Sequence, residues 1–166
     1  MQESTVSKAG DYSIRHCGPD DIPSVINVNT VALPEHYSDY FYYDILKDFP
    51  STFLVAEKEE RGVVGYIMCR IEYGLSMTKR FGLAKKGHVI SIAVLEDYRG
   101  KGIGTTLIKS AVEEIRKATG RECYLEVRTT NRGAIDLYTK LGFKVSSTLH
   151  GYYKDGESAY TMAMPL

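Results

Sequence analysis

The stretch Arg99-Gly100-Lys101-Gly102-Ile103-Gly104-Thr105-Thr106 is the most informative part of the sequence. It follows residues 87–94, whose β-branched and apolar side chains predict a strand, and it opens a segment with apolar residues at helical spacing. Such a junction leaves several backbone N–H groups unpaired at the helix start, where the helix dipole favours an anion. The glycines let a ligand approach the main chain closely, and Arg99 and Lys101 add positive charge. The stretch therefore predicts a pyrophosphate-binding loop.

The spacing of the glycines excludes two other phosphate-binding loops. A Walker A loop needs Ser or Thr directly after its Lys, but Gly102 follows Lys101. A dinucleotide-binding fingerprint, G-x-G-x-x-G, would need its third glycine where Thr105 or Leu107 stands. The remaining alternative is a glycine-rich turn with no ligand. It is disfavoured, because glycines at a helix start lower stability unless something needs the exposed amides.

Hydrophobic periodicity outside this loop predicts an α/β fold with the element order β-α-α-β-β-β-α-β-α-β-β and a largely antiparallel first half. Strands are expected at residues 12–17, 52–57, 63–72, 87–94, 122–128, 143–147 and 159–164. Helices are expected after residues 18–21, over about 38–47, from 102 to 120 and from 131 to 141. Residues 73–86 are mixed in character and are expected to form a loop.

The composition is that of an ordinary globular protein. The 166 residues are 43% hydrophobic and 25% charged, with 21 Lys and Arg against 21 Asp and Glu. This balance disfavours a nucleic-acid partner, and no apolar run is long enough to cross a bilayer. We expect a flexible tail over residues 1–10, without the apolar stretch of a signal peptide, and one domain over residues 11–166.

The three cysteines, Cys17, Cys69 and Cys123, are widely spaced and form no metal-binding motif. We expect them to be buried small side chains, with no metal site and a reduced, cytoplasmic environment. A covalent acetyl-cysteine at Cys123 is a minor alternative.

Two segments together resemble one protein family. Arg99-x-x-Gly102-x-Gly104 resembles the [QR]-x-x-G-x-[GA] motif of the GNAT acetyltransferase superfamily. Residues 131–143, Asn-Arg-Gly-Ala-Ile-Asp-Leu-Tyr-Thr-Lys-Leu-Gly-Phe, resemble its N-x-x-A-x-x-[LF]-Y-x-x-x-G-F segment. The resemblance covers residues 11–166. It implies the GNAT fold, a mixed and mostly antiparallel twisted sheet of about seven strands flanked by about four helices.

Residues 33–37, 65–68, 87–94 and 151–160 narrow the resemblance to archaeal protein N-terminal acetyltransferases. These enzymes are similar to the catalytic subunit of the eukaryotic ribosome-associated enzyme that acts after methionine removal. The resemblance implies acetyl-CoA as the donor, CoA as a product and protein or peptide N-termini as the acceptor. It also makes an auxiliary subunit or the ribosome a candidate partner.

The resemblance assigns residues to the binding of acetyl-CoA. The backbone of the strand before the loop should meet the pantetheine arm and the thioester carbonyl. Tyr138 should face the sulfur of CoA as general acid, with a core tyrosine as the alternative. The expected acetyl-CoA-binding residues are Ile92, Ala93, Val94, Arg99, Gly100, Lys101, Gly102, Ile103, Gly104, Thr105, Asn131 and Tyr138.

Three side chains are candidates for the base. An α-amino group has a pKa of about 7.7–8.0, so a modest base suffices, whereas a lysine amine with a pKa near 10.4 needs more help. His88 opens the strand that should carry the acetyl group, and imidazole titrates in the useful range. Glu35 borders the expected peptide entrance as base or substrate anchor. Glu126 stands where related enzymes can have a histidine, with a pairing to His88 or an ion pair to Arg128 as alternatives.

The expected peptide-binding residues are Leu33, Glu35, Tyr37, Tyr152 and Tyr153. Residues 40–43, Tyr-Phe-Tyr-Tyr, are expected to lie partly in the hydrophobic core and partly at its rim, and not to form a ligand-binding cluster. Three functions remain open: transfer to protein N-termini, transfer to lysine or a polyamine, and binding of acyl-CoA without turnover.

Overall fold

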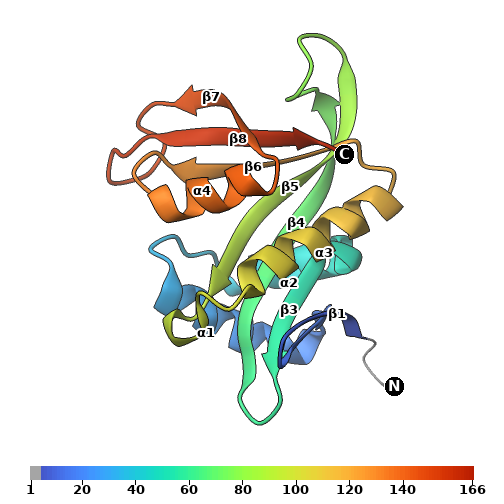
Figure 1. Cartoon of the computed structure of the whole chain (residues 1–166), viewed down its shortest axis with the longest axis vertical. Coiled ribbons are helices and arrows are strands. Elements are labelled where there is room, and N and C mark those ends of the chain that lie inside the picture. The colour runs from blue at the N-terminus through green and yellow to red at the C-terminus, as the bar shows by residue number, and fades with distance from the viewer. Residues whose placement is uncertain (1–4) are drawn as a thin grey trace. The chain divides into compact units, whose positions relative to one another are not determined.

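The computed structural model describes residues 5–166 (Figure 1). Its strands are β1 (Thr5–Ala9), β2 (Tyr12–His16), β3 (Phe53–Lys58), β4 (Gly62–Leu75), β5 (Leu83–Val94), β6 (Glu122–Arg128), β7 (Lys144–Leu149) and β8 (Ala159–Pro165). Its α-helices are α1 (Ile22–Ala32), α2 (Asp39–Asp48), α3 (Ile103–Lys117) and α4 (Arg132–Lys140). Short 3₁₀ helices are η1 (Pro19–Asp21), η2 (Pro50–Thr52) and η3 (Glu96–Tyr98).

The strands follow the hydrogen-bonded order β1-β2-β3-β4-β5-β6-β8-β7. Neighbours from β1 to β4 pair antiparallel, as do β6 with β8 and β7 with β8, whereas β5 and β6 run parallel. This confirms the predicted mixed, mostly antiparallel α/β fold, with eight strands instead of about seven among the residues that the structure describes.

The structure differs from the sequence prediction at two strand segments. β1 lies inside the predicted tail of residues 1–10, of which residues 1–4 lie outside the described part. β4 and β5 reach into the predicted loop of residues 73–86. There the backbone N–H of Ser76 donates to Gly82, and the carboxylate of Glu122 accepts from the backbone N–H of Met77 at 2.7 Å. These tertiary contacts stabilise strands that local propensity does not predict.

The chain divides into two compact units, the first comprising residues up to Arg70 and Ile90–Glu114. In this unit, α1 and α2 pack against one face of β3. Phe53 and Val55 of β3 share a core with Ile22 of α1 and Tyr42 of α2. Because side chains alternate along a strand, these two β3 residues lie on the same face.

The opposite face of β3 in the first unit is also buried. Leu54 and Ala56 are fully covered, as is Leu107 of α3. A hydrogen bond of 2.6 Å between the hydroxyls of Ser7 and Ser110 joins β1 to α3. The apolar residues at helical spacing in this helix are buried: Ile103, Leu107, Ile108, Ala111, Val112 and Ile115.

The second unit comprises Ile71–Val89 and Ile115–Leu166. β6 pairs along its whole length with β8, and the ring of Tyr138 in α4 lies 5.9 Å from that of Phe143, which precedes β7. A Cβ at Gly87 would lie 2.2 Å from Cδ1 of Ile115, so this point of β5 requires glycine for contact with the end of α3.

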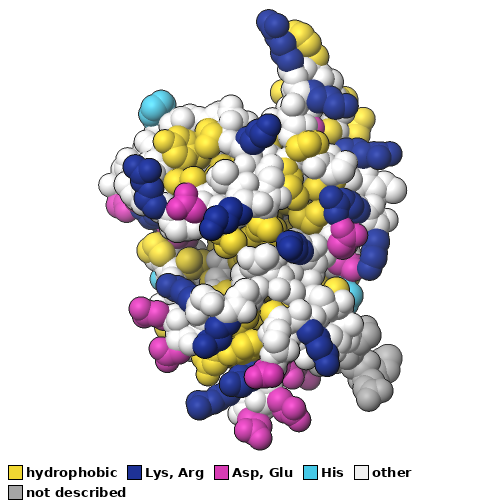
Figure 2. Space-filling view, in the orientation of Figure 1, with side chains coloured by type: hydrophobic (Ala, Val, Ile, Leu, Met, Phe, Trp, Pro, Cys, Tyr) yellow, Lys and Arg dark blue, Asp and Glu magenta, His cyan; other side chains and the backbone are white. Residues whose placement is uncertain are grey.

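Figure 2 shows Lys and Arg side chains spread over the viewed face with hydrophobic side chains between them. Within residues 5–166, no helix combines the length and the apolar character needed to cross a membrane.

Candidate active site

The glycine-rich loop adopts the conformation that its sequence predicts. Gly100 and Gly102 have φ angles of 73° and 82°, a region that side-chain-bearing residues avoid. A Cβ on either glycine would meet no described atom within 4 Å. The carbonyl of Gly102 accepts both the backbone N–H and the hydroxyl of Thr106, at 3.0 and 2.8 Å. The two glycines at the start of α3 therefore border open space, which suits an anion that approaches the helix N-terminus.

Positive charge is held next to this loop. Nε of Arg99 donates to the carbonyl of Val94 at 2.9 Å, which fixes the guanidinium near the end of β5, and Lys101 is exposed. The backbone N–H of Leu95 donates to the carbonyl of Val64 at 2.9 Å. These hydrogen bonds hold the end of β5 to the loop and to β4.

The segment Ile92–Val94 lies on β5 directly before this loop. Ala93 is buried, and its neighbours are half-buried. A Cβ at Gly65 of β4 would lie 3.0 Å from the carbonyl oxygen of Ala93, so glycine allows the close approach of the two strands. The predicted pantetheine-binding segment is therefore the end of a strand that packs closely against β4.

Asn29 of α1 holds the loop between α1 and α2 through two contacts. Nδ2 of Asn29 donates to the carbonyl of Glu35 at 3.1 Å, and its Oδ1 lies 2.9 Å from Nδ1 of His36. The hydroxyl of Tyr37 donates to the carbonyl of Ile90 at 3.2 Å. Leu33 and Glu35 are half-buried here, so the first unit gathers the three predicted peptide-binding residues of this loop.

His88 pairs with Glu126, one of the two alternatives expected from the sequence. Its Nε2 lies 2.7 Å from Oε2 of Glu126, and these side chains are 12% and 18% exposed. On the other side of the ring, Nδ1 lies 3.3 Å from Oε1 of Glu72 but is not aligned for a hydrogen bond. The ring therefore lies between two carboxylates from β4 and β6.

Tyr124 completes this cluster. Its ring stacks on the imidazole of His88, with centroids 4.3 Å apart and planes 5° from parallel, because the two residues are register partners of β5 and β6. Its hydroxyl donates to Oε2 of Glu72 at 2.6 Å. Arg128, the other predicted partner of Glu126, instead pairs with Asp155 at 2.8 Å.

Burial fixes the protonation of two other candidate groups. It raises the pKa of the Tyr138 phenol to about 12, so this phenol keeps its proton over the physiological range. It also raises the pKa of the Cys123 thiol to about 12, which argues against the minor acetyl-cysteine alternative. Asn131 caps α4 as predicted, with its Oδ1 accepting the backbone N–H of Ala134 at 3.2 Å.

Tyr152 and Tyr153 lie on the connection between β7 and β8. Their rings meet edge to face at 5.0 Å, and Tyr152 is 51% exposed. Burial and the nearby negative charge of Glu126 raise the pKa of Tyr152. The guanidinium of Arg128 lies 4.0 Å from the ring centroid of Tyr153 and stabilises the connection.

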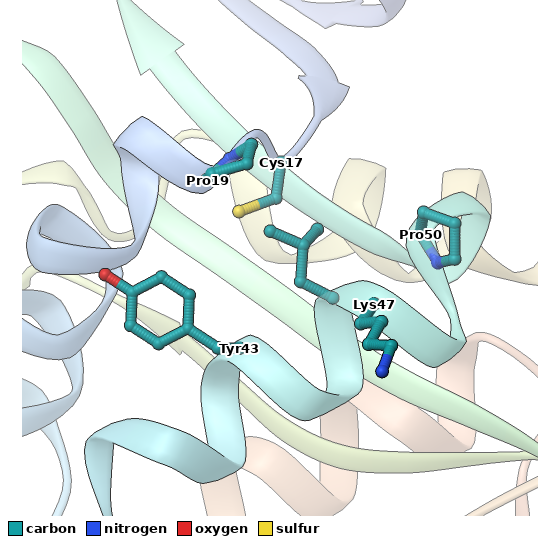
Figure 3. A pocket seen from close by; sticks show the side chains of 6 residues that line it. Cys17, Pro19, Tyr43, Lys47 and Pro50 are labelled. Carbon is teal, nitrogen blue, oxygen red and sulfur yellow. The ribbon is translucent and has the colours of Figure 1, made fainter.

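A separate surface depression of about 350 Å³ lies in the first unit (Figure 3). The residues that line it are Cys17, Pro19, Tyr43, Leu46, Lys47 and Pro50. None of them is a predicted site residue. Tyr43 is partly exposed and Tyr42 is buried, which confirms that residues 40–43 are core plus rim.

Sequence reasoning missed three structural residues of the site: Asn29 beneath the α1–α2 loop, and Glu72 and Tyr124 around His88. One signal was available, because Tyr124 and Glu126 are two apart in a strand and must share a face. Glu72 and Asn29 had no such signal, since their partners are distant in the sequence.

The Acetyltransferase (GNAT) family matches residues 22–143, so the chain belongs to this family of acetyltransferases. An N-alpha-acetyltransferase of Sulfurisphaera tokodaii is 48% identical over 168 residues, covering 100% of both chains. The N-terminal acetyltransferase A complex catalytic subunit NAA10 of Arabidopsis thaliana is 35% identical over 90% of this chain and 75% of that protein. The structure of Arabidopsis thaliana Naa50 with the bisubstrate analogue CoA-Ac-MVNAL has a TM-score of 0.80 and 28% identity, covering 94% and 99% of the two chains.

Proposed function

We propose that the chain transfers the acetyl group of acetyl-CoA directly to the α-amino group of protein N-termini, within one ternary complex. Full-length similarity to a named N-alpha-acetyltransferase supports the reaction class. The observation that carries the chemistry is the 2.7 Å pair of His88 and Glu126, which places a titratable imidazole against a carboxylate.

The pair suggests the order of proton transfer. Nε2 of His88 already binds Glu126, and Nδ1 is buried. Glu126 is therefore the outer member that takes the ammonium proton, directly or through water, and Nε2–H of His88 holds its carboxylate in place. An α-amino group needs only this modest assistance, because its pKa is about 7.7–8.0.

Acetyl-CoA supplies the activated acetyl group as a thioester. The open cradle at Gly100 and Gly102 suits its pyrophosphate, with Arg99, Lys101, Ile103, Gly104 and Thr105 completing that binding segment. The amides of Ile92–Val94 would hold the arm and the carbonyl oxygen. Asn131 would contact the cofactor from the start of α4.

Tyr138 would stabilise the departing sulfur. A phenol with a pKa of about 12 is a weaker acid than a thiol, whose pKa is about 8.5, so complete proton transfer to the thiolate is uphill. Its role is then that of a hydrogen-bond donor to a developing negative charge.

Leu33, Glu35 and Tyr37, with Tyr152 and Tyr153, would bind the first residues of the acceptor. Glu35 offers a carboxylate for the substrate ammonium, and the tyrosine rings offer surfaces for the peptide chain. Anchoring of this loop through Asn29 supports a defined acceptor position.

We also place the reaction in the cytoplasm, because buried Cys17, Cys69 and Cys123 are thiols. The naming of the NAA10 relative as a subunit of a complex supports an auxiliary subunit as a partner. The ribosome is the second candidate partner. Acetylation of a nascent chain by the enzyme alone and with ribosomes tests the ribosome as a partner. Equal rates in both samples would argue against a ribosome-bound enzyme.

Labelled acetyl-CoA with three acceptors tests the reaction: a Ser-starting peptide, an N-blocked lysine peptide and spermidine. We expect label on the α-amino group of the first peptide only. Preferential labelling of the lysine peptide or of spermidine would show that the acceptor is a lysine side chain or a polyamine and not a protein N-terminus. Binding of acetyl-CoA without labelling of any acceptor would point to an acyl-CoA-binding protein.

A further inference from the structure

The surroundings of His88 contain an imbalance that the acid-base pair alone does not explain. Two carboxylates flank the ring, but only Glu126 is aligned to accept its proton, at 2.7 Å from Nε2. Glu72 lies 3.3 Å from Nδ1 without the alignment of a hydrogen bond. A carboxylate so close to a buried ring nitrogen would ordinarily turn to accept a proton from it.

Tyr124 accounts for this imbalance. Its hydroxyl donates to Oε2 of Glu72 at 2.6 Å, so one oxygen of that carboxylate is held by β6. Its ring lies flat on the imidazole of His88, at 4.3 Å between centroids and 5° between planes. One side chain thus restrains both the carboxylate and the plane of the imidazole.

We propose that Tyr124 is a positioning residue, whose hydroxyl keeps Glu72 from taking the Nδ1 proton of His88. The neutral imidazole then carries its proton on Nε2, in the hydrogen bond to Glu126. Nε2–H of His88 then holds the carboxylate of Glu126, and a proton that arrives there stays on Glu126. The catalytic importance of this arrangement rests on the proposed function, but the position of the ring proton does not.

The other charged and titratable groups near the ring in the second unit do not compete with Glu72 for Nδ1 of His88. Nζ of Lys86 lies 5.1 Å from the ring centroid of Tyr124 and donates to the carbonyl of Leu75 at 2.6 Å. Tyr152 is in electrostatic range of Glu126, on the Nε2 side. Glu72 is therefore the carboxylate that faces Nδ1 in this unit.

Nitrogen-15 NMR of the imidazoles tests the proposal directly. In the wild-type protein, at a pH at which the imidazole is neutral, His88 should show a protonated Nε2 and an unprotonated Nδ1. In Tyr124→Phe the ring remains, but Glu72 loses the hydrogen bond that holds its Oε2 away from Nδ1. The ratio of unprotonated to protonated Nδ1 should fall on the order of tenfold, the size expected for one hydrogen bond to a carboxylate.

Two further variants make the assignment specific. Adding Glu72→Gln to Tyr124→Phe removes the competing carboxylate and should restore the wild-type proton position. Tyr73→Phe removes a hydroxyl from the exposed neighbour of Glu72 and should change nothing. Unchanged signals of His16, His36 and His150 report that each variant is folded. Wild-type nitrogen shifts for His88 in folded Tyr124→Phe would overturn the proposal.

Steady-state kinetics then separates this inference from the proposed function. If the chain acetylates N-terminal peptides, Tyr124→Phe should lower kcat roughly tenfold with little change in the KM of either substrate, and Glu72→Gln should recover part of the loss. If wild-type protein acetylates no N-terminal peptide while the NMR result holds, the acceptor assignment fails and the positioning stands. Peptide acetylation without the NMR change would overturn the positioning and leave the proposed function in place.

Discussion

The two candidate parts of the site are built in different ways. The loop at the start of α3 is made of backbone: its amides and two left-handed glycines form an open cradle. The His88 cluster is made of side chains from β4, β5 and β6 that converge on one imidazole. A backbone site tolerates changes that preserve the conformation, whereas a side-chain site depends on single atoms. The comparison therefore predicts different kinetic signatures for mutations in the two regions.

The largest expected effect is that of His88→Ala. Without His88, Glu126 loses the donor that positions it, and kcat should fall by roughly 10²–10⁴-fold, because positioned acid-base groups contribute that much to proton transfer. The affinity for CoA, measured by isothermal titration calorimetry, should stay near that of the wild type. A large loss of CoA affinity would show that the side-chain cluster and the phosphate loop are not separable.

Gly102→Val tests the backbone half of the comparison. A valine at a φ of 82° is strained, and its side chain would occupy the open space next to the amides. We expect CoA to bind on the order of 10–100-fold more weakly, the value of one hydrogen bond to a charged group. Gly62→Val is a matched control, since Gly62 has a φ of 79° in the β3–β4 turn and equally open surroundings.

The control separates strain from ligand binding. Both variants should lose similar thermal stability, which calorimetry can measure, but only Gly102→Val should lose CoA affinity. Equal loss of affinity in the two variants would mean that the glycine acts through stability and not through the bound pyrophosphate.

The same contrast explains what the sequence could predict. The loop depends on consecutive residues, so the spacing of its glycines is enough to indicate its conformation. The pairing of His88 with Glu126 could be named as an alternative, because both residues open or occupy predicted strands. Glu72 lies at the end of a predicted strand, but its role could not be assigned, since its partners His88 and Tyr124 are distant in the sequence. β1 was missed for a related reason, because its pairing with β2 and its bond to α3 are not visible in a short polar segment.

Tyr138→Phe should have an intermediate effect, with kcat roughly tenfold lower, because one hydrogen bond to a charged sulfur is lost. Burial raises the pKa of this phenol to about 12, so its proton is present at every pH below that value. For a group whose pKa rises on folding, stability is complete below the unfolded value of about 10 and is lost as the pH rises through the folded value. The wild-type pH–rate profile should therefore show no falling limb near pH 10 from Tyr138. A limb there that disappears in Tyr138→Phe would contradict this assignment.

The smallest expected effect is that of Glu35→Gln, and it decides between base and anchor. Glu35 lies on the α1–α2 loop, and Asn29 donates to its backbone carbonyl, a hydrogen bond that the variant keeps. An anchor for the substrate ammonium contributes to binding, and a partly exposed ion pair is worth up to about 1 kcal/mol, or roughly fivefold. The KM for the peptide should rise by that factor, while kcat and CoA affinity stay unchanged. A fall in kcat comparable to that of His88→Ala, at unchanged peptide KM, would instead make Glu35 the base and leave the His88 cluster a supporting role.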